Sequence, residues 1–522
     1  MKTIVKLLLA ILVWNFHLTS KAQTKVEKID SLVSAYSNAD CFNGVVFVSE
    51  KGKVIFEKAF GIADRELNVA MNADMKFKIA SISKPFTALI ILQLVDEGII
   101  KLDGKIIDYI TDYKGKKGES ITIHQLLTHT SGILQNLDPE REAVQERLFH
   151  SLRDMVKYAE ESDLYFEPGT GFHYSNLAYN ILAYIAEKVT NKSFDRLMEE
   201  RIFKPLGMKN TKQYNSAKIE KNLAKGYEYK LLDGYENASS YDPSYTVGPG
   251  GLISNIEDLR KFDKALNDKR IISKELYEKM ITPSKYASYG YGWELSNKIV
   301  NNIQDTINII SHSGSINGFG SNLARIENDS ILVIVLKNSR SDTYISPAFA
   351  PTIANEIISI MYNEGFQIPK KSIARHLGHS IGQNGIDVAT KEYYRIKKTD
   401  CEHFNFEESE LNKLGIELYF KFKMTEEALK VFEINMLEFP HSYNTYDSYA
   451  YILMQKGDYI NSIKYYNEGL KILNKFPQEN NSESIIKDAE NAVKSIEMMK
   501  EKLSLHPKVK NFEFQLFSTS TP

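Results

Sequence analysis

Two apolar patterns, one early in the chain and one late, predict β-hairpins. In residues 44–61, β-branched and aromatic residues flank a Lys-Gly-Lys turn. Residues 322–326 and 331–336 predict a second hairpin, because a turn containing Asn-Asp separates two apolar runs. Between the hairpins, residues 87–97 and 177–189 carry apolar side chains at helical spacing. A sheet with strands from both ends and helices inserted between them is an α+β fold.

The chain from about residue 405 onward shows a different signal, an internal period of 34 residues. The period resembles the tetratricopeptide repeat, although Lys423 stands where a turn glycine is usual. A plain bundle of helical hairpins is the alternative interpretation. Two repeats bury little apolar surface alone, so we expect a helix around residues 485–503 to cap them, or the preceding domain to cover them. The aligned positions are Ala428, Leu429, Phe432 and Pro440 in the first unit, and Ser462, Ile463, Tyr466 and Asn474 in the second.

The first 22 residues have the pattern of an export signal. Lys2 and Lys6 lie beside the apolar residues 7–14, and polar residues and Ala22 follow. The apolar stretch is too short to cross a bilayer core of about 30 Å, so we expect cleavage after Ala22, with a retained membrane anchor as the alternative. The sequence therefore predicts an exported protein, periplasmic or secreted, with no integral membrane segment after cleavage.

The amino-acid composition is that of an ordinary globular protein. The chain has 522 residues, of which 43% are hydrophobic and 25% charged, and 65 Lys and Arg against 67 Asp and Glu give a net charge of −2. A chain so close to neutral lacks the electric field that would hold it on nucleic acid or on an anionic membrane. We expect a small-molecule or peptide substrate and no nucleic-acid partner.

The predicted domain boundaries follow the changes in pattern. Length alone, at roughly 150 residues per domain, suggests about three units. We assign residues 1–22 to the signal peptide, 23–365 to the α+β domain, 366–404 to a glycine-containing linker, 405–505 to the helical repeats and 506–522 to a tail.

The first candidate for chemistry is Ser81 with Lys84, just before the predicted helix 87–97. A separation of three residues on the first turn of a helix puts the hydroxyl and the amine on one face. There the amine can take the proton while the oxygen attacks a carbonyl. The amides at a helix N-terminus also favour a developing anion. The spacing is common, so the position at the start of an apolar helix is what distinguishes Ser81.

Two further elements follow along the chain. Tyr174 and Asn176 form one: a Tyr hydroxyl near a Lys can have a lowered pKa, and the Asn amide offers a donor and an acceptor to a substrate amide. For this element alone, a buried Tyr with a helix-capping Asn is an equal alternative. His312, Gly314 and Ser315 form the other, in a glycine-rich run where a strand can approach a ligand closely and the Ser315 N–H can serve an oxyanion.

In this order the elements resemble the Ser-x-x-Lys, Tyr-x-Asn and Lys/His-x-Gly motifs of the serine β-lactamase and penicillin-binding protein superfamily. Residues 126–132, 205–208 and 250–254 are also similar to stretches of its class C β-lactamase-related branch. The resemblance covers about residues 29–362. It implies an antiparallel sheet flanked by helices, with an all-helical subdomain.

The resemblance also implies roles for individual residues. Ser81 would be the nucleophile, Lys84 and Tyr174 would share the proton transfers, and Asn176 would hold the substrate amide. The backbone N–H groups of Ser81 and Ser315 would form the oxyanion hole. The resulting acyl-enzyme would then be resolved by water.

One position departs from the β-lactamase pattern. Those enzymes usually have Lys where this chain has His312, and His is seen among related D,D-carboxypeptidases, D-amino-acid peptidases and esterases. A neutral imidazole binds a substrate carboxylate less strongly than an ammonium does, so we expect feeble β-lactam turnover. His312, Gly314 and Ser315 remain predicted substrate-binding residues.

No metal or cofactor is expected. His124 and His129 are five residues apart, which separates them by about 140° around a helix and disfavours a metal pair.

The sequence therefore predicts an exported serine hydrolase that cleaves an amide or ester through a Ser81 acyl-enzyme. The alternative is a non-catalytic penicillin-binding or peptidoglycan-sensing protein whose repeats recruit a protein partner.

Overall fold

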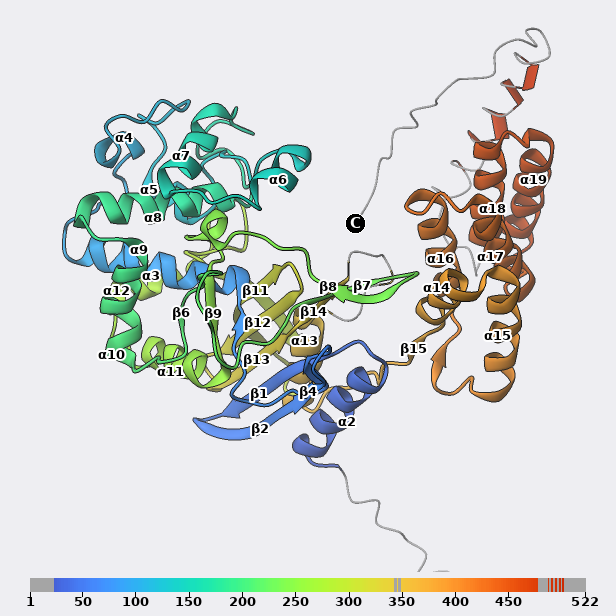
Figure 1. The fold of residues 1–522 in the computed structure, drawn as a ribbon, viewed down its shortest axis with the longest axis horizontal. Coiled ribbons are helices and arrows are strands. Elements are labelled where there is room, and N and C mark those ends of the chain that lie inside the picture. The colour runs from blue at the N-terminus through green and yellow to red at the C-terminus, as the bar shows by residue number, and fades with distance from the viewer. Residues whose placement is uncertain are drawn as a thin grey trace, which may run out of the picture. The chain divides into compact units, whose positions relative to one another are not determined.

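The fold is taken from a computed structural model, which describes residues 23–341, 345, 349–476 and separate positions between 487 and 501. The predicted signal peptide and tail lie outside these residues, as does most of the predicted capping helix. The chain forms two compact units (Figure 1). The first contains the chain up to Glu228, Asn237–Arg340 and Pro347–Pro369; the second contains Tyr229–Glu236, Ser341–Ser346 and the chain from Lys370 onward.

A six-stranded antiparallel sheet is the centre of the first unit, in the order β10-β11-β12-β13-β1-β2. Its first and last hairpins are neighbours, because β1 pairs with β13 from Gly44↔Lys337 to Glu50↔Ile331. Both predicted hairpins and the α+β layout are confirmed. The strands are β1 (Gly44–Glu50), β2 (Lys53–Phe60), β10 (Glu294–Val300), β11 (Asp305–Ile316), β12 (Phe319–Ile326) and β13 (Ile331–Lys337).

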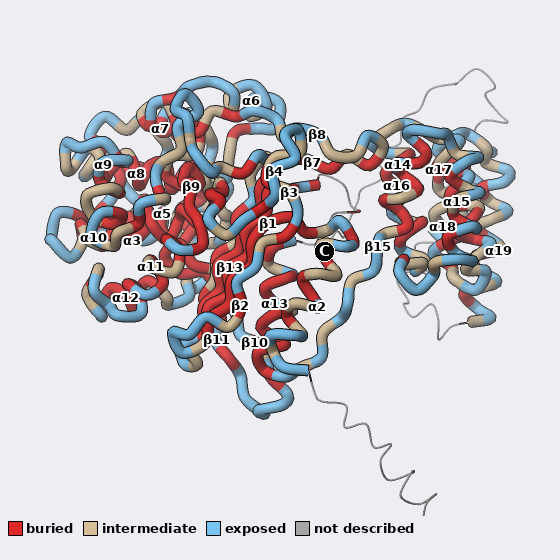
Figure 2. The backbone as a smooth tube through the Cα atoms, turned by 60° about the horizontal axis from the view of Figure 1, so that its bottom comes forward, coloured by how far each residue is buried: buried red, intermediate tan, exposed pale blue. Residues whose placement is uncertain are grey.

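Alternate residues of the central strands face two different layers. On β1, Val45 and Phe47 belong to the hydrophobic core on one face, and Val46 and Val48 to the core on the other, as the period of two along a strand requires. Helices α2 (Lys25–Asn38) and α13 (Ala350–Met361) cover the second face. Figure 2 shows the strands as a continuous buried layer.

The first face is covered by a helical part built around α3 (Ser83–Asp96) and α8 (Asn176–Thr190), which contact each other. Both predicted helices are confirmed. Every residue from Ser83 to Leu92 is buried, so α3 is apolar on nearly all sides. The other helices are α4 (Ile106–Tyr109), α5 (Ile123–Leu127), α6 (Pro139–Gln145), α7 (Leu152–Glu161), α9 (Phe194–Met198), α10 (Lys204–Leu206), α11 (Ile256–Asn267) and α12 (Lys274–Met280).

Short elements connect these layers. A three-stranded sheet, β5-β9-β6, lies beside the start of α3. Strand β5 shortly precedes α3 in the chain, and the Ile79 N–H after β5 donates to the Leu252 carbonyl of β9. The short elements are β3 (Ile62–Asp64), β4 (Val69–Ala70), β5 (Phe77–Lys78), β6 (Lys212–Gln213), β7 (Tyr227–Lys230), β8 (Gly234–Asn237), β9 (Leu252–Ser254), β14 (Ser339–Ser341), η1 (Ala80–Ile82), η2 (Glu199–Phe203) and η3 (Pro243–Thr246).

The second unit is mostly helical. Helices α16 and α17 pack against each other, and α18 and α19 do the same. Ala428 and Ser462, one period of 34 residues apart, are both fully buried, and so are Phe432 and Tyr466. Successive helical hairpins are thus confirmed, while the resemblance to tetratricopeptide repeats stays a prediction. The elements are α14 (Ile373–Asn384), α15 (Ile386–Thr399), α16 (Glu408–Phe420), α17 (Thr425–Glu438), α18 (Tyr443–Lys456), α19 (Tyr459–Lys475), β15 (Lys371–Ser372) and β16 (Phe404–Asn405).

The predicted linker at 366–404 is wrong. Helices α14 and α15 occupy most of it, and the second unit begins at Lys370 instead of residue 405. Glycine composition suggested a linker, but a different property of glycine explains these residues.

Gly378 and Gly382 lie one turn apart on α14, where they allow close packing. An added Cβ would lie 2.4 Å from the Leu231 side chain at the first position and 2.5 Å from the Leu232 backbone oxygen at the second. The segment Tyr229–Glu236 therefore packs directly onto α14, with Leu231 fully buried.

Candidate active site

Ser81 lies in the one-turn helix η1, which leads directly into α3. The preceding Ala80 has a φ of +47°, a left-handed conformation that a non-glycine residue adopts only where its surroundings hold it. Here the Ser321 hydroxyl donates to the Ile79 carbonyl (2.8 Å), and the Ile79 N–H donates to the Leu252 carbonyl (3.0 Å). These bonds clamp the turn between β12 and β9 and fix the half-buried Ser81.

Strand β11 approaches the same turn because Gly314 has no side chain. An added Cβ would lie 2.3 Å from the Ile79 oxygen and 3.2 Å from the Ala80 Cβ. Ser315 follows Gly314 and is exposed, paired with Gly320 across the β11–β12 hairpin. The predicted close approach of a strand at Gly314 is therefore made to the turn that carries Ser81.

The Lys84 amine is buried among three oxygens. Nζ lies 3.1 Å from the Ser81 hydroxyl, 2.8 Å from Asn176 Oδ1 and 3.2 Å from the Pro249 carbonyl. Burial lowers the pKa of Lys84 well below its usual value. A neutral amine would donate its two hydrogens to the amide and carbonyl oxygens, which can only accept. The lone pair of Lys84 Nζ could then accept the hydrogen of the Ser81 hydroxyl.

Tyr174 and Asn176 reach the site from the start of α8. Their neighbour Ser175 is the N-cap: its hydroxyl accepts from the Ala178 N–H (3.0 Å) and donates to the Leu134 carbonyl (2.7 Å). The Tyr174 ring centre lies 4.5 Å from Lys84 Nζ, and the Tyr174 hydroxyl is hydrogen-bonded to Ser81.

The protonation of Tyr174 differs from the expectation. Burial raises the pKa of Tyr174 and outweighs its hydrogen bond with Ser81. The nearby Lys84 does not produce the lowered pKa that the sequence left open for Tyr174, because burial disfavours the charged phenolate. Tyr174 is a proton donor in this environment.

His129 holds the second element in place. Its backbone has a φ of +58°, and its Nδ1 accepts a hydrogen bond from the Ser175 N–H (3.0 Å). The His129 and Tyr174 ring centres are 4.4 Å apart. Among the described residues, Nε2 of His129 has no hydrogen-bond partner. Sequence reasoning disfavoured His129 as a metal ligand and placed it in the family-like stretch 126–132, and no local pattern indicated this packing role.

His312 lies beside the cluster but is only 1% exposed. Its Nε2 is 2.9 Å from the Tyr289 hydroxyl, and its Nδ1 is 2.6 Å from the Ser313 carbonyl oxygen. Burial lowers the pKa of His312 to about 4. The imidazole is therefore neutral near pH 7, as expected, but no ring nitrogen is left for a substrate.

The structure thus brings Ser81, Lys84, Tyr174 and Asn176 into one hydrogen-bonded cluster, with Gly314 packed against its turn. Sequence reasoning missed Tyr289 and the Pro249 carbonyl. It also missed Asn136, whose Oδ1 accepts from Asn176 Nδ2 (2.9 Å). Nothing in the local sequence marks these contacts, because each joins segments far apart in the chain.

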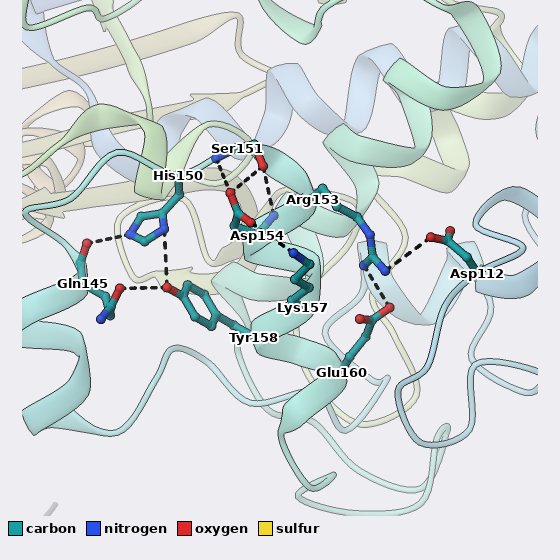
Figure 3. Close-up of polar contacts among 9 residues, drawn as sticks. All are labelled: Asp112, Gln145, His150, Ser151, Arg153, Asp154, Lys157, Tyr158 and Glu160. Atoms are coloured by element: carbon teal, nitrogen blue, oxygen red, sulfur yellow. Dashed lines mark hydrogen bonds and ion pairs between the residues drawn. The ribbon is translucent and has the colours of Figure 1, made fainter.

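The loop that carries Asn136 is anchored farther along by polar contacts. The Tyr158 hydroxyl donates to Gln145 Oε1 (2.8 Å), and His150 Nε2 lies 2.8 Å from the Gln145 carbonyl (Figure 3). The His150 N–H donates to the Ser244 hydroxyl (2.9 Å). Residues 135–152 therefore include α6 and have fixed contacts at both ends, through Asn136 and His150. Among the described residues, no three His, Cys, Asp or Glu side chains are grouped to hold a metal.

Comparison with known proteins identifies relatives over most of the chain. The β-lactamase family model matches residues 29–346. Penicillin-binding protein 4* of Bacillus subtilis is 28% identical over 78% of this chain and 96% of its own length. Putative penicillin-binding protein PbpX of the same organism is 30% identical over 52% of this chain and 67% of its own length.

Solved structures share the fold. The octameric penicillin-binding protein homologue from Pyrococcus abyssi has a TM-score of 0.57 at 25% identity, covering 69% of this chain and 82% of its own. A D-amino acid amidase from Ochrobactrum anthropi SV3 has a TM-score of 0.56 at 24% identity, covering 64% of this chain and 99% of its own.

Proposed function

This chain belongs to the β-lactamase family of serine hydrolases, and we propose that it cleaves an amide or ester through an acyl-enzyme on Ser81. The observation that carries the proposal is the Lys84 amine, 3.1 Å from the Ser81 hydroxyl in a site that favours its neutral form. A buried neutral amine in that position is a general base for a serine nucleophile.

The steps follow from the protonation states. Ser81 Oγ bonds to the substrate carbonyl carbon while its proton passes to Lys84. Tyr174, held protonated by burial, gives a proton to the leaving nitrogen or oxygen as that bond breaks, and regains one from Lys84. Water then hydrolyses the ester on Ser81. Asn176 would hold the substrate amide with the side chain that also contacts Lys84 and Asn136.

The proposed substrates are D,D-carboxypeptidase or D-amino-acid peptidase substrates, or small esters. The D-amino acid amidase and the hydrolase EstCE1, which share the fold, are compatible with this range. We propose weak β-lactamase activity at most, because the neutral His312 offers no charge to a β-lactam carboxylate.

The test is intact-mass detection of a covalent adduct after incubation with a fluorophosphonate and, separately, with a penicillin. We expect a fluorophosphonate adduct on Ser81 and a penicillin adduct that is released slowly. Ser81→Ala removes both adducts, whereas Ser83→Ala, two residues along, retains them. Absence of any adduct on folded wild-type protein would contradict the acyl-enzyme and favour the sensing function.

We also propose that the protein is exported. The family relatives are penicillin-binding proteins, and the predicted signal lies in residues 1–22. No helix among the described residues is long and apolar enough to cross a membrane. N-terminal sequencing of protein from a periplasmic or culture fraction should begin at Gln23; a start at Met1 in that fraction would contradict cleavage.

A further inference from the structure

Both ring nitrogens of His312 are engaged by the protein itself. Nδ1 faces the Ser313 carbonyl oxygen at 2.6 Å and Nε2 faces the Tyr289 hydroxyl at 2.9 Å. Because a carbonyl oxygen can only accept, Nδ1 must carry a hydrogen. Near neutral pH the ring holds one hydrogen, since burial lowers the pKa of His312 to about 4. Nε2 is then an acceptor, and the Tyr289 O–H donates to it.

Tyr289 is itself held in place. It is 3% exposed, and its ring centre lies 6.0 Å from that of Phe172 and 6.2 Å from that of Tyr174. The ring centres of Tyr289 and His129 are 4.7 Å apart. The phenol therefore cannot turn away from His312 without disturbing a packed aromatic cluster.

The titratable groups around His312 come from several elements. Glu294 on β10 has a carboxylate oxygen 3.8 Å from Nδ1 and accepts from the Ser313 hydroxyl (3.0 Å). Lys84 on α3 opposes protonation of His312 when its own amine is protonated, and the Tyr174 ring centre lies 6.2 Å from that of His312. Of these groups, Glu294 is the one with an exposed charge, at 40% side-chain exposure. A substrate carboxylate arriving here meets like charge.

We propose that Tyr289 is a positioning residue that keeps His312 neutral and turned into the protein. Within the proposed range of substrates, the enzyme then prefers amides and esters whose leaving group carries no carboxylate and disfavours D,D-carboxypeptidase substrates, whose leaving group does. The inference rests on the proposed acyl-enzyme at Ser81. Recognition at the third motif is then made by the backbone of β11 beside Gly314 and Ser315, and the histidine side chain contributes no contact to the substrate.

The substrate test compares two esters with one acyl group. N-acetyl-D-alanine esterified to D-lactate has a carboxylate in its leaving group, and the methyl ester of the same compound does not. In both, the bond from Ser81 Oγ to the alanyl carbonyl forms, the lactate C–O bond breaks, and the lactate oxygen leaves with a proton. We expect kcat/KM to favour the methyl ester by about fivefold at low ionic strength and less at high salt.

The variant test uses Tyr289→Phe, which removes only the hydroxyl. Loss of a donor to Nε2 makes protonation of His312 easier, because the hydrogen bond stabilised the neutral ring. We expect the preference for the methyl ester to fall toward one as pH is lowered to about 5, with turnover of the methyl ester changed less than about threefold. Tyr286→Phe, at an exposed Tyr three residues earlier in the chain, should match wild type.

A spectroscopic readout tests the wild-type protein first and the Tyr289→Phe variant second. The ¹³Cδ2 and ¹⁵N signals of His312 in ¹³C,¹⁵N-histidine-labelled protein should show the Nδ1–H tautomer at pH 7. In Tyr289→Phe the His312 signals should titrate at higher pH than in wild type. An Nε2–H tautomer, or a Tyr289→Phe titration identical to wild type, would overturn the proposal.

Different results would contradict the acyl-enzyme on Ser81 and the role of Tyr289. If Ser81 forms no fluorophosphonate adduct, the acyl-enzyme itself is wrong and the ester comparison has no bearing. If the adduct forms and wild type prefers the carboxylate ester, only the role of Tyr289 and His312 is overturned.

Discussion

At the scale of single residues, the chemistry depends on which atoms around Lys84 can donate hydrogen bonds and which can only accept them. The oxygens of Asn176 and Pro249 can only accept, so together with burial they specify which hydrogens a neutral Lys84 must give and where its lone pair points. The Ser81–Lys84 pair was predictable from its spacing. The neutrality of Lys84 and Tyr174 was not, because burial depends on segments far away in the chain; Asn176 and Pro249, for example, are 92 and 165 residues from Lys84.

Lys84 carries the first residue-level prediction. Hydrolysis of a neutral ester should rise with pH through the pKa of Lys84 and then level, because the deprotonated amine is the base. Since burial lowers that pKa, the midpoint should lie well below 10.5. A stopped-flow pH profile measures it, and a midpoint near 10.5 would show that Lys84 is not the base.

Lys84→Arg is the matched variant. A guanidinium stays protonated at every accessible pH and cannot take the Ser81 proton, so acylation should fall about 10³-fold. Lys78→Arg is the control on the neighbouring strand β5, where the Lys78 amine lies 4.6–5.5 Å from the centres of three aromatic rings. It should keep most of the activity.

At the scale of elements, the sequence predicted the helices and hairpins whose apolar residues recur with a regular period. The hairpins at 44–61 and 322–336 and the helices α3 and α8 follow from periods of two and 3.6. Glycine misled the prediction at 366–404, because the same residue serves flexible linkers and tight packing. The contact of Leu231 with Gly378, which the sequence does not show, identifies these glycines as packing residues.

The N-cap of α8 gives an element-level prediction. Ser175→Ala removes the cap to Ala178 and leaves the Leu134 carbonyl without its donor, so the free energy of unfolding should fall by about 1–2 kcal/mol. Because Tyr174 and Asn176 flank the cap, kcat should fall as well. Urea denaturation followed by circular dichroism measures the first effect.

Ser193→Ala is the control for the cap. Ser193 is the N-cap of α9 but makes no side-chain capping bond, so its replacement should change stability by less than about 0.5 kcal/mol. Equal effects of the two substitutions would contradict a specific role for the Ser175 hydroxyl.

At the scale of the whole molecule, the helical unit is not a detachable C-terminal domain. Ending the chain at Pro369 would remove α14 and leave Leu231 without the packing that now buries it fully. We expect the shortened chain to aggregate. Size-exclusion chromatography and light scattering measure this.

Two substitutions in the shortened chain distinguish aggregation from loss of the fold. In the shortened chain, Leu231→Ser and Leu232→Ser should restore solubility and the fluorophosphonate adduct on Ser81. A soluble, active chain without these substitutions would show that Tyr229–Glu236 does not need α14.

The division of the chain has one more consequence. Because the segments Tyr229–Glu236 and Ser341–Ser346 belong to the helical unit, the polypeptide crosses between the units five times, at the borders 228/229, 236/237, 340/341, 346/347 and 369/370. A protease that cuts at 369/370 therefore frees the chain from Lys370 onward of its only peptide link, and that fragment stays attached through packing alone, such as that of Leu231 on α14.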